Sequence, residues 1–360
     1  MKQLVIALLG RKDEPTDAVE EYCRYLGDAL QTHEIQLEIR RVLWETRGWS
    51  EALRVLRLQA AAWQGLWVLV QYTALAWSAR GFPHKILLTL KILKAAGARV
   101  AVVFHDVEPY AGTRLIDALR RAIQVRTMRR AMRVADLAVF TVPPEKLSWQ
   151  PKSDSNVAFV PVGANLPIPL ELSTQTTRVS APTVGVFSIT GGDAGARETR
   201  LIVEAVRHAA QQLGELRLSV FGRHAELREQ DLANGLRGLR VELSVEGVID
   251  PAQIVVRLCA CDVLLFVRGG ISSRRGSALA GIACGLPVIA FSGSETAAPI
   301  TDAGVLLIPA DAPEELDSAL LGVLRNPALR AELAIRSRAA YQTYFAWPAI
   351  ASRLVAVLRQ

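Results

Sequence analysis

Residues 263–290 read Val-Leu-Leu-Phe-Val-Arg-Gly-Gly-Ile-Ser-Ser-Arg-Arg-Gly-Ser-Ala-Leu-Ala-Gly-Ile-Ala-Cys-Gly-Leu-Pro-Val-Ile-Ala. The first five residues form an apolar run that is typical of a buried strand, and the stretch from Arg268 to Ser277 has the composition of a loop. Small residues after Ser277 predict a helix, which Gly285 and Pro287 end before a second apolar run. This order predicts a parallel α/β sheet with the loop at the carboxyl end of a strand.

The loop also has the composition of a site for a diphosphate. The start of a helix presents unpaired N–H groups and a partial positive charge, and both attract phosphate. Guanidinium groups add charge-assisted hydrogen bonds of about 1.5–3 kcal/mol each. We expect one of the two adjacent arginines to face the ligand; the alternative is that the arginines form salt bridges between domains. The candidate residues are Arg268, Ser272, Ser273, Arg274, Arg275, Gly276 and Ser277.

Strand-like and helix-like segments alternate along almost the whole chain, which predicts parallel sheets covered by helices on both faces. Asp17 and Glu20 predict a capping box at the start of the first helix. Residues 167–182 have the composition of a linker between an N-terminal domain at 1–166 and a second domain at 183–345. Strands are expected at 4–9, 35–42, 66–72, 100–104, 137–142, 157–160, 184–189, 216–221, 240–245, 263–267, 288–291 and 305–308, and helices at 17–32, 50–62, 85–96, 198–213 and 251–259.

Composition narrows the classes of function. A chain of 360 residues with 51% apolar and 21% charged residues is expected to fold into two packed domains. The net charge of +7 suits nucleic acid, an anionic membrane surface or phosphorylated small molecules. Nucleic acid is disfavoured because no helix-turn-helix or basic-aromatic platform stands out. The sequence contains neither G-x-G-x-x-G nor a Walker motif, so dinucleotide oxidoreduction and P-loop ATP hydrolysis lack their phosphate-binding signatures.

The N-terminus and the cysteines indicate a cytoplasmic protein. The apolar core of Met1–Gly10 is short and is followed by Arg-Lys-Asp-Glu, so the segment reads as a first strand and not as a signal peptide. No apolar run approaches the roughly 18 residues of a membrane-spanning helix. The four cysteines are Cys23, Cys259, Cys261 and Cys284, and their spacing predicts buried thiols, not a disulfide framework or a zinc site.

Several segments of the second half, taken in order, resemble the retaining glycosyltransferases of family four, which have the GT-B fold of two Rossmann-like domains facing a cleft. The resemblance is carried by Val184–Phe187, Arg197–Ala205, Leu218–Gly222, Glu246–Val248, Ala260–Leu265, Gly285–Ala290 and Phe345–Trp347. The first half matches more loosely, chiefly through Val100–Asp106.

The resemblance implies a metal-independent transferase that moves a sugar from a nucleoside-diphosphate sugar to a glycan or lipid-linked acceptor in bacterial cell-surface polysaccharide assembly, with no other cofactor. The second domain would bind the donor, with Arg197 at the diphosphate and Gly222 and Arg223 at the nucleotide. The first domain would bind the acceptor, and a C-terminal helix at 346–360 would cross back to it. His105 would face the donor sugar, and His105 and Asp106 are the candidate catalytic residues, which would polarise or orient a sugar hydroxyl. Asp106 and Glu108 are also candidates for contacts with the acceptor. The alternative is that the His105 side chain only forms a hydrogen bond with a backbone carbonyl at the end of the strand.

The chain also departs from the family pattern. The family carries two glutamates eight residues apart, and Ser272 and Ala280 stand at those places. A second hypothesis is therefore a non-catalytic subunit that binds a sugar nucleotide or acts as a scaffold in a glycan-assembly complex. An epimerase or phosphorylase on the same fold is a third, for which the sequence offers neither a placeable acid–base pair nor a cofactor lysine.

Two further features have competing readings. Gly10 follows the first strand and either lets the backbone approach a ligand or forms a tight turn. Four arginines at helical spacing predict one basic stripe, which suits the anionic inner face of a membrane or is a solvated face. They are Arg126, Arg129, Arg130 and Arg133.

Overall fold

The computed structural model describes residues 2–14, 16–110, 112, 114–149, 156–169 and 181–360. The chain divides into two compact units, one ending at Val162 but including Trp347–Gln360, and the other spanning Gly163–Ala346. Most of the predicted linker, residues 170–180, lies outside the described residues. Each unit contains a six-stranded parallel sheet, so the predicted α/β architecture with two parallel sheets is confirmed.

The sheet of the first unit has the strand order β2-β1-β3-β4-β5-β6, and every neighbouring pair is parallel. The order reverses between β1 and β3, which makes the carboxyl ends of these two strands the topological switch point where ligands of open sheets bind. The strands are β1 (Gln3–Leu9), β2 (Ile35–Arg41), β3 (Trp67–Tyr72), β4 (Arg99–Phe104), β5 (Leu137–Phe140) and β6 (Val157–Phe159).

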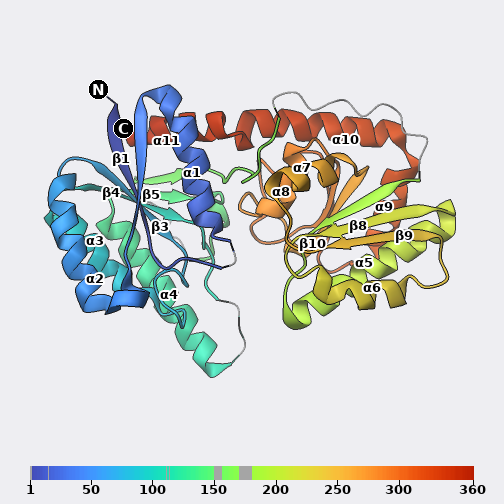
Figure 1. Ribbon diagram of the computed structural model, residues 1–360, viewed down its shortest axis with the longest axis horizontal. Coiled ribbons are helices and arrows are strands. Elements are labelled where there is room, and N and C mark those ends of the chain that lie inside the picture. Colours follow the sequence, from blue (N-terminus) through green and yellow to red (C-terminus); the bar gives the residue numbers. More distant parts are fainter. Residues whose placement is uncertain (1, 15, 111, 113, 150–155, 170–180) are drawn as a thin grey trace. The chain divides into compact units, whose positions relative to one another are not determined.

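Alternate residues of these strands enter two separate cores. Ile6 and Leu8 pack on the face covered by α2, α3 and α4, whereas Val5 and Leu9 pack on the face covered by α1 and α11 (Figure 1). The helices are α1 (Ala18–Leu30), α2 (Trp44–Ala60), α3 (Ile86–Ala95), α4 (Leu115–Val134) and α11 (Trp347–Leu358); the short 3-10 turns are Gln31–His33, Ala61–Trp63, Pro83–Lys85 and Pro144–Lys146.

The second unit has the strand order β12-β11-β10-β7-β8-β9, again with parallel pairs throughout. This is the order of dinucleotide-binding sheets, and it places the switch point between β7 and β10. The strands are β7 (Thr183–Phe187), β8 (Leu216–Phe221), β9 (Val241–Glu246), β10 (Val263–Gly270), β11 (Val288–Phe291) and β12 (Val305–Ile308).

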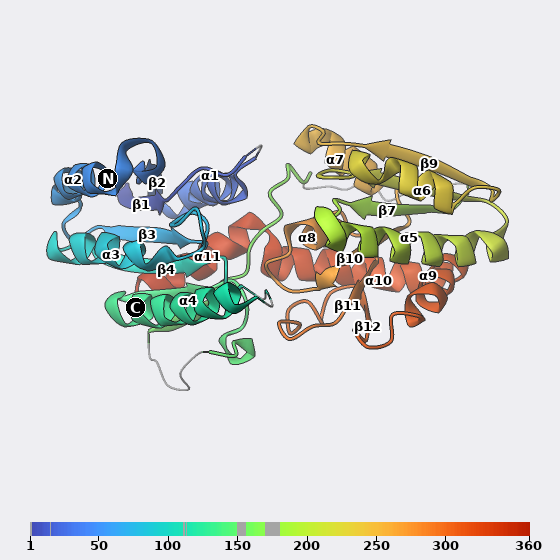
Figure 2. The same ribbon diagram turned by 90° about the horizontal axis from the view of Figure 1, so that it is seen from below.

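Helices cover both faces of this sheet (Figure 2). On one face Ile202 of α5 and Leu320 of α9 pack on apolar side chains of the strands. On the other, Gly281 of α8 lies so close to Leu264 that an added Cβ would be 2.4 Å from Leu264 Cδ2. The helices are α5 (Gly192–Leu213), α6 (Glu229–Gly235), α7 (Pro251–Cys259), α8 (Gly276–Ala283), α9 (Glu315–Arg325) and α10 (Pro327–Ala340), with a 3-10 turn at Glu226–Arg228 and a π-helical turn at Tyr341–Phe345.

Three local predictions need correction. The helices expected at 198–213 and 50–62 each begin six residues earlier, at Gly192 and at Trp44. Asp17 caps α1 by accepting hydrogen bonds from the backbone of Val19 and Glu20, but the carboxylate of Glu20 binds Arg41 at 2.7 Å and does not complete a capping box. Within the described part of the chain, no helix combines the length and apolar character that crossing a bilayer requires.

The last helix belongs to the core of the first unit, which gives a direct test. Leu354 is 1% exposed and packs in the core that α1 and α11 share with the sheet. We expect Leu354→Ala to leave a cavity and to lower the free energy of unfolding by about 2–5 kcal/mol. Chemical denaturation checks this, with Ser352→Ala on the exposed side of α11 as the control. Equal effects of the two substitutions would contradict the packing described.

Candidate functional site

A bulge in β10 places Arg268 at the carboxyl edge of the second sheet. The pairing of β10 with β11 jumps from Phe266 opposite Ala290 to Gly270 opposite Phe291, so residues 267–269 leave the ladder. Gly269 supports this bulge with a φ of 74°, which glycine adopts without strain. Bulges re-aim side chains, and this one turns a residue of the central strand toward the switch point beside β7.

The guanidinium of Arg268 bridges the two elements that meet at the switch point. Its Nε lies 3.5 Å from the hydroxyl of Thr190, just after β7, and its Nη1 lies 3.4 Å from the hydroxyl of Ser277 in the first turn of α8. Burial lowers the pKa of Arg268; the negative charge of Glu198 opposes this shift and the positive charge of Arg223 adds to it. An arginine remains charged in this setting, so the edge holds a partly desolvated cation with a second cation nearby.

Two helices begin at the same edge. The α5 helix starts at Gly192, and Gly195 lies so close to the Thr190 carbonyl that a Cβ would be 1.9 Å from its oxygen. The carboxylate of Glu198 accepts a 2.7 Å hydrogen bond from the Thr190 backbone N–H, which fixes the strand-to-helix turn. Because α8 also begins here, at Gly276, the N–H groups and positive dipole ends of two helices lie at the carboxyl edge of this sheet.

The turn after β8 completes this edge. Gly222 has a φ of 95°, and a Cβ there would lie 2.6 Å from Ser188 Oγ, so the tight turn requires glycine. Ser188 and His224 adopt positive φ values of 66° and 63°, a conformation that costs energy in residues with a side chain. Such strain gathers at functional sites. Gly222 and Arg223, predicted to contact the nucleotide, both lie in this turn.

The arginine loop itself differs from the prediction. Glu295 binds Arg274 through two hydrogen bonds, 2.8 Å to Nε and 2.6 Å to Nη2, and accepts a third of 2.9 Å from Ser272 Oγ. Ser272 and Ser273 are 0% and 1% exposed. The structure thus gives Ser272 and Arg274 an internal partner in Glu295, and their contact with a diphosphate stays a prediction.

A second set of contacts, made by Gly293 and Thr296, holds the same loop. The hydroxyl of Thr296 donates a 2.6 Å hydrogen bond to the carbonyl of Ile271 and accepts one of 2.9 Å from the backbone of Gly293. Gly270 and Gly293 come so close that a Cβ on Gly270 would be 2.7 Å from the Cα of Gly293. The segment 292–296 therefore acts as a clamp on the loop that leads to Arg275 and Gly276.

The resemblance implied that Arg197 is at the diphosphate. Arg197 is in the second turn of α5, where its side chain is exposed. Its position in the helix does not by itself place the Arg197 side chain beside Arg268 and Ser277. Arg197 remains a candidate to contact a ligand that extends along the start of α5.

In the first unit, a hollow of about 300 Å³ opens at the switch point between β1 and β3. The residues following these strands line it, including Arg11, Lys12 and Thr73. Gly10 is explained by the chain itself, because a Cβ there would lie 2.2 Å from the carbonyl oxygen of Ala76. The close approach predicted at Gly10 is thus to the protein backbone, although Gly10 also lines the hollow.

His105 and Asp106 follow β4 at this edge. The ring nitrogen Nε2 of His105 lies 2.8 Å from the side-chain oxygen of Gln71, and the ring packs edge-on against Tyr22 at 4.9 Å. The carboxylate of Asp106 accepts a 2.7 Å hydrogen bond from the backbone of Ala74 and so fixes the loop after β3. Asp106, but not His105, lines the hollow.

A second hollow of about 350 Å³ shares Leu75 and Asp106 with the first. Its wall is formed partly by Arg120, whose guanidinium lies over the ring of Tyr110 at 4.8 Å and pairs with Asp117 at 2.5 Å. Glu108 also lines it, and its carboxylate accepts hydrogen bonds from the backbone and hydroxyl of Ser148 at 3.1 and 3.0 Å. The two hollows together give the first unit a polar edge with an aromatic surface.

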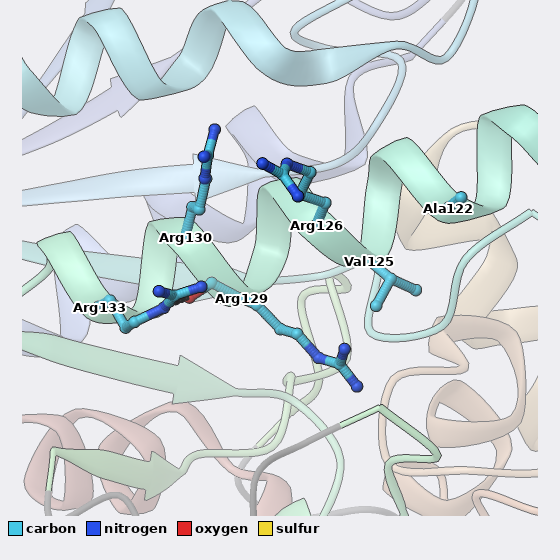
Figure 3. Close-up of a pocket in the computed structure, with 6 residues that line it drawn as sticks. All are labelled: Ala122, Val125, Arg126, Arg129, Arg130 and Arg133. Atoms are coloured by element: carbon cyan, nitrogen blue, oxygen red, sulfur yellow. Dashed lines mark hydrogen bonds between the residues drawn. The ribbon is translucent and has the colours of Figure 1, made fainter.

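The four arginines predicted to form one stripe lie on α4 and line one hollow, but their side chains spread in different directions (Figure 3). Arg129 is held by a 2.9 Å hydrogen bond from its Nε to the Trp149 carbonyl, and the side chains of Arg126 and Arg130 extend away from it. The Nε of Arg133 donates to the Arg129 carbonyl at 3.3 Å. These arginines line an open hollow of about 580 Å³ with Ala122 and Val125.

Sequence reasoning missed the acidic and hydroxyl partners of the second unit: Thr190, Glu198, Glu295 and Thr296. The role of Glu198 could be predicted in part, because a carboxylate near the start of a helix often accepts a hydrogen bond from the backbone of the preceding turn. Glu295 is 21 residues from Arg274, and no local pattern connects the two positions.

Residues 188–326 match the family model described as "Glycosyl transferases group 1". The matched segment begins just after β7 and contains Thr190, the bulge at Arg268 and the clamp at Glu295. No curated protein matches the chain significantly.

Solved structures share the fold over nearly the whole chain at low sequence identity. HepE from Anabaena, in complex with UDP and glucose, is 14% identical, with 99% of both chains covered and a TM-score of 0.65. Sucrose-phosphate synthase from Thermosynechococcus elongatus is 19% identical, with 99% of this chain and 98% of that chain covered and a TM-score of 0.68. A glycosyltransferase from Rickettsia africae is 10% identical, with the same coverage and a TM-score of 0.69. The chain has the GT-B fold.

The contact between Glu295 and the arginine loop predicts a dependence of stability on pH. Burial alone would raise the pKa of Glu295, but Arg274, Ser272 and Arg275 together hold it below its ordinary value. A lowered folded pKa gives stability that is fully present above the unfolded pKa, about 4.3, and is lost as the pH falls through the folded pKa. We expect Glu295→Gln to destabilise the protein most near neutral pH and progressively less in acid.

Urea unfolding at a series of pH values measures this difference. Glu242→Gln is the control, because Glu242 forms an exposed ion pair with Arg217 on β8 and should cost little at any pH. A penalty for Glu295→Gln that stays constant from neutral pH into acid would show that the charge of Glu295 does not hold the loop.

Proposed function

We propose that the protein is a retaining glycosyltransferase that uses a nucleoside-diphosphate sugar without a metal ion. The observation that carries the proposal is the cationic edge at the β7–β10 switch point, where Arg268 lies between the starts of α5 and α8. The match of residues 188–326 to group 1 glycosyl transferases supports the same assignment for this unit. A bound UDP in HepE, which shares the fold, makes UDP the first nucleotide to test.

The chemistry of sugar transfer suits this edge. When the glycosidic bond to the donor breaks, negative charge develops on the leaving diphosphate. Fixed cations and N–H groups aimed at that charge stabilise the transition state without having to reorganise. Arg268 and Ser277 would contact the diphosphate, together with the N–H groups at Gly276 and at the start of α5. The turn at Gly222 and Arg223 would receive the nucleoside.

We assign the acceptor to the first unit. Its two hollows meet at Asp106 and offer hydrogen-bonding groups beside the exposed ring of Tyr110, a combination that suits sugar hydroxyls and apolar sugar faces. Asp106 and Glu108 would orient acceptor hydroxyls. His105 would contact the donor sugar, as the resemblance implies, with its ring direction set by Gln71. A glycan or lipid-linked acceptor of a cell-surface polysaccharide fits this assignment.

Binding of nucleoside diphosphates tests the proposal. We expect at least one of UDP, GDP, ADP and dTDP to raise the melting temperature, because a ligand that binds the folded state stabilises it by mass action. Arg268→Ala should weaken that binding by about 10- to 150-fold, the equivalent of one charge-assisted hydrogen bond. Titration calorimetry measures the loss.

The matched control is Arg240→Ala, which removes the same charge from an exposed position just before β9, at the opposite edge of the sheet. It should leave the affinity within about twofold of the parent. If no nucleoside diphosphate binds, or if both variants lose affinity equally, the site is not at the β7–β10 switch point. If the protein binds a UDP-sugar but releases no UDP during a long incubation, the alternative of a non-catalytic subunit that binds a sugar nucleotide is favoured.

We also propose that α4 brings the enzyme to the inner face of the cytoplasmic membrane. Leu115 and Leu119 in the first turns of this helix are 93% and 53% exposed, and Arg126 and Arg130 follow them on the same helix. Exposed apolar side chains next to cations are a combination that binds anionic bilayers.

Each basic residue near an anionic surface contributes about 1 kcal/mol, so the double variant Arg126→Ala/Arg130→Ala should bind vesicles of phosphatidylglycerol and phosphatidylcholine about 30-fold more weakly. Vesicle sedimentation measures this, with Arg237→Ala/Arg240→Ala in the second unit as the charge-matched control. Equal binding of the parent to pure phosphatidylcholine vesicles would contradict the electrostatic contribution.

A further inference from the structure

A carboxylate is built into the arginine loop of the second unit. The Oε1 atom of Glu295 accepts a 2.6 Å hydrogen bond from Nη2 of Arg274. Its Oε2 atom accepts a 2.8 Å bond from Nε of Arg274 and a 2.9 Å bond from Oγ of Ser272. Each carboxylate oxygen can accept about two hydrogen bonds, so within the described part of the chain Oε1 has one acceptor position that no protein donor uses.

The carboxylate is ionised and can be reached from solvent. The hydrogen bonds from Arg274 and Ser272 and the charge of Arg275 hold the pKa of Glu295 below its ordinary value, although burial opposes this shift. An ionised carboxylate only accepts hydrogen bonds. The side chain of Glu295 is 11% exposed, which leaves access for a small polar group of a ligand. A fixed acceptor with a free position is the kind of group that recognises a ligand hydroxyl.

Glu295 lies at the same edge of the sheet as the candidate diphosphate site. It follows β11, which pairs in parallel with β10, and the pairing continues from the Ile271 N–H to the Phe291 carbonyl at 2.9 Å. The loop after β10 begins and ends at Arg268 and Ser277, whose side chains lie 3.4 Å apart. Glu295 holds the middle of that loop. A ligand anchored at Arg268 and Ser277 therefore has the loop and its carboxylate as close neighbours.

We propose that Glu295 accepts a hydrogen bond from a hydroxyl group of the donor sugar and thereby sets which sugar nucleotides the protein prefers. The inference rests on the proposed function, because the diphosphate at Arg268 and Ser277 anchors the ligand. The sugar is joined to the outer phosphate through a single oxygen atom, so its hydroxyls extend over the groups that surround that anchor. A sugar that lacks the recognised hydroxyl, or holds it in the other configuration, would leave a charged acceptor without its donor and bind more weakly.

A purely structural role is the competing interpretation, since Glu295 also neutralises Arg274. Glu198, at the same edge, has such a role: it is 7% exposed, and its carboxylate accepts a 2.7 Å hydrogen bond from the backbone of Thr190. The two interpretations differ in one measurable quantity. A structural contact supports the loop for every ligand, whereas a contact with the sugar acts only when the sugar is present.

Titration calorimetry on the full-length protein separates the two roles. From UDP-glucose, UDP-galactose, UDP-N-acetylglucosamine and GDP-mannose, the compound that the parent binds most tightly is compared with its free nucleoside diphosphate. Glu295→Gln keeps the size of the side chain and removes the charge. It should weaken binding of the sugar nucleotide about tenfold more than binding of the nucleoside diphosphate, because a hydrogen bond to a charged acceptor becomes one to a neutral group.

Thr296→Val is the matched control. It removes the hydroxyl that donates to the Ile271 carbonyl and so loosens the same loop without touching the carboxylate. It should change the two affinities alike, to within about twofold. If Glu295→Gln also weakens both ligands equally, the inference is wrong and the proposed function stands. If the parent binds no nucleoside diphosphate and none of the four sugar nucleotides, both are wrong.

Hydrogen–deuterium exchange of the parent protein gives a second test that does not depend on the folding of a variant. At equal saturation, the sugar nucleotide should slow exchange of the amides at 293–297 more than the nucleoside diphosphate does. The reason is that the sugar would hold Glu295 and, with it, the turn in which the Thr296 N–H binds the Gly293 carbonyl. Equal protection of this segment by the two ligands would overturn the proposal.

Discussion

A partly buried positive charge on the central strand of the second sheet governs the candidate site. Arg268 loses water when it is enclosed by Thr190 and Ser277, and the nearby Arg223 adds repulsion while Glu198 supplies only partial compensation. A cation in this state gains more from an anion than one in bulk water does, because the interaction is less screened. The bulge, the turn at Gly222 and the starts of α5 and α8 all direct groups toward the same place.

Most of the fold could be predicted from the sequence, because it depends on local patterns that recur along the chain. Buried parallel strands are continuous apolar runs, and strands such as Leu216–Phe221 and Val288–Phe291 were predicted with the boundaries that the structure shows. The start of α5 was missed, since Gly192-Asp193-Ala194-Gly195 reads as a loop until Gly195 is seen packed against the Thr190 carbonyl. That contact depends on the shape of the turn before the helix, and no helix propensity indicates it.

The residues of the candidate site could be predicted only in part. Composition identified the loop at 268–277, but it could not separate the arginine that faces the switch point from the one that is held internally. That distinction depends on Glu295, which reaches Arg274 from a segment beyond the next strand. In the same way, the arginines of α4 follow one helical spacing, yet the Trp149 carbonyl engages Arg129 and leaves Arg126 and Arg130 extended elsewhere. Long-range partners decide the role of each cation.

Hydrogen–deuterium exchange with and without saturating UDP tests most directly whether the second sheet binds a diphosphate at its switch point. The account predicts slower exchange of backbone amides at 188–192, 222–224 and 268–277, where the turns and helix starts would donate to the nucleotide. Protection confined to the loops of the first unit at 10–13 and 73–76, at a UDP concentration where calorimetry shows binding, would contradict it.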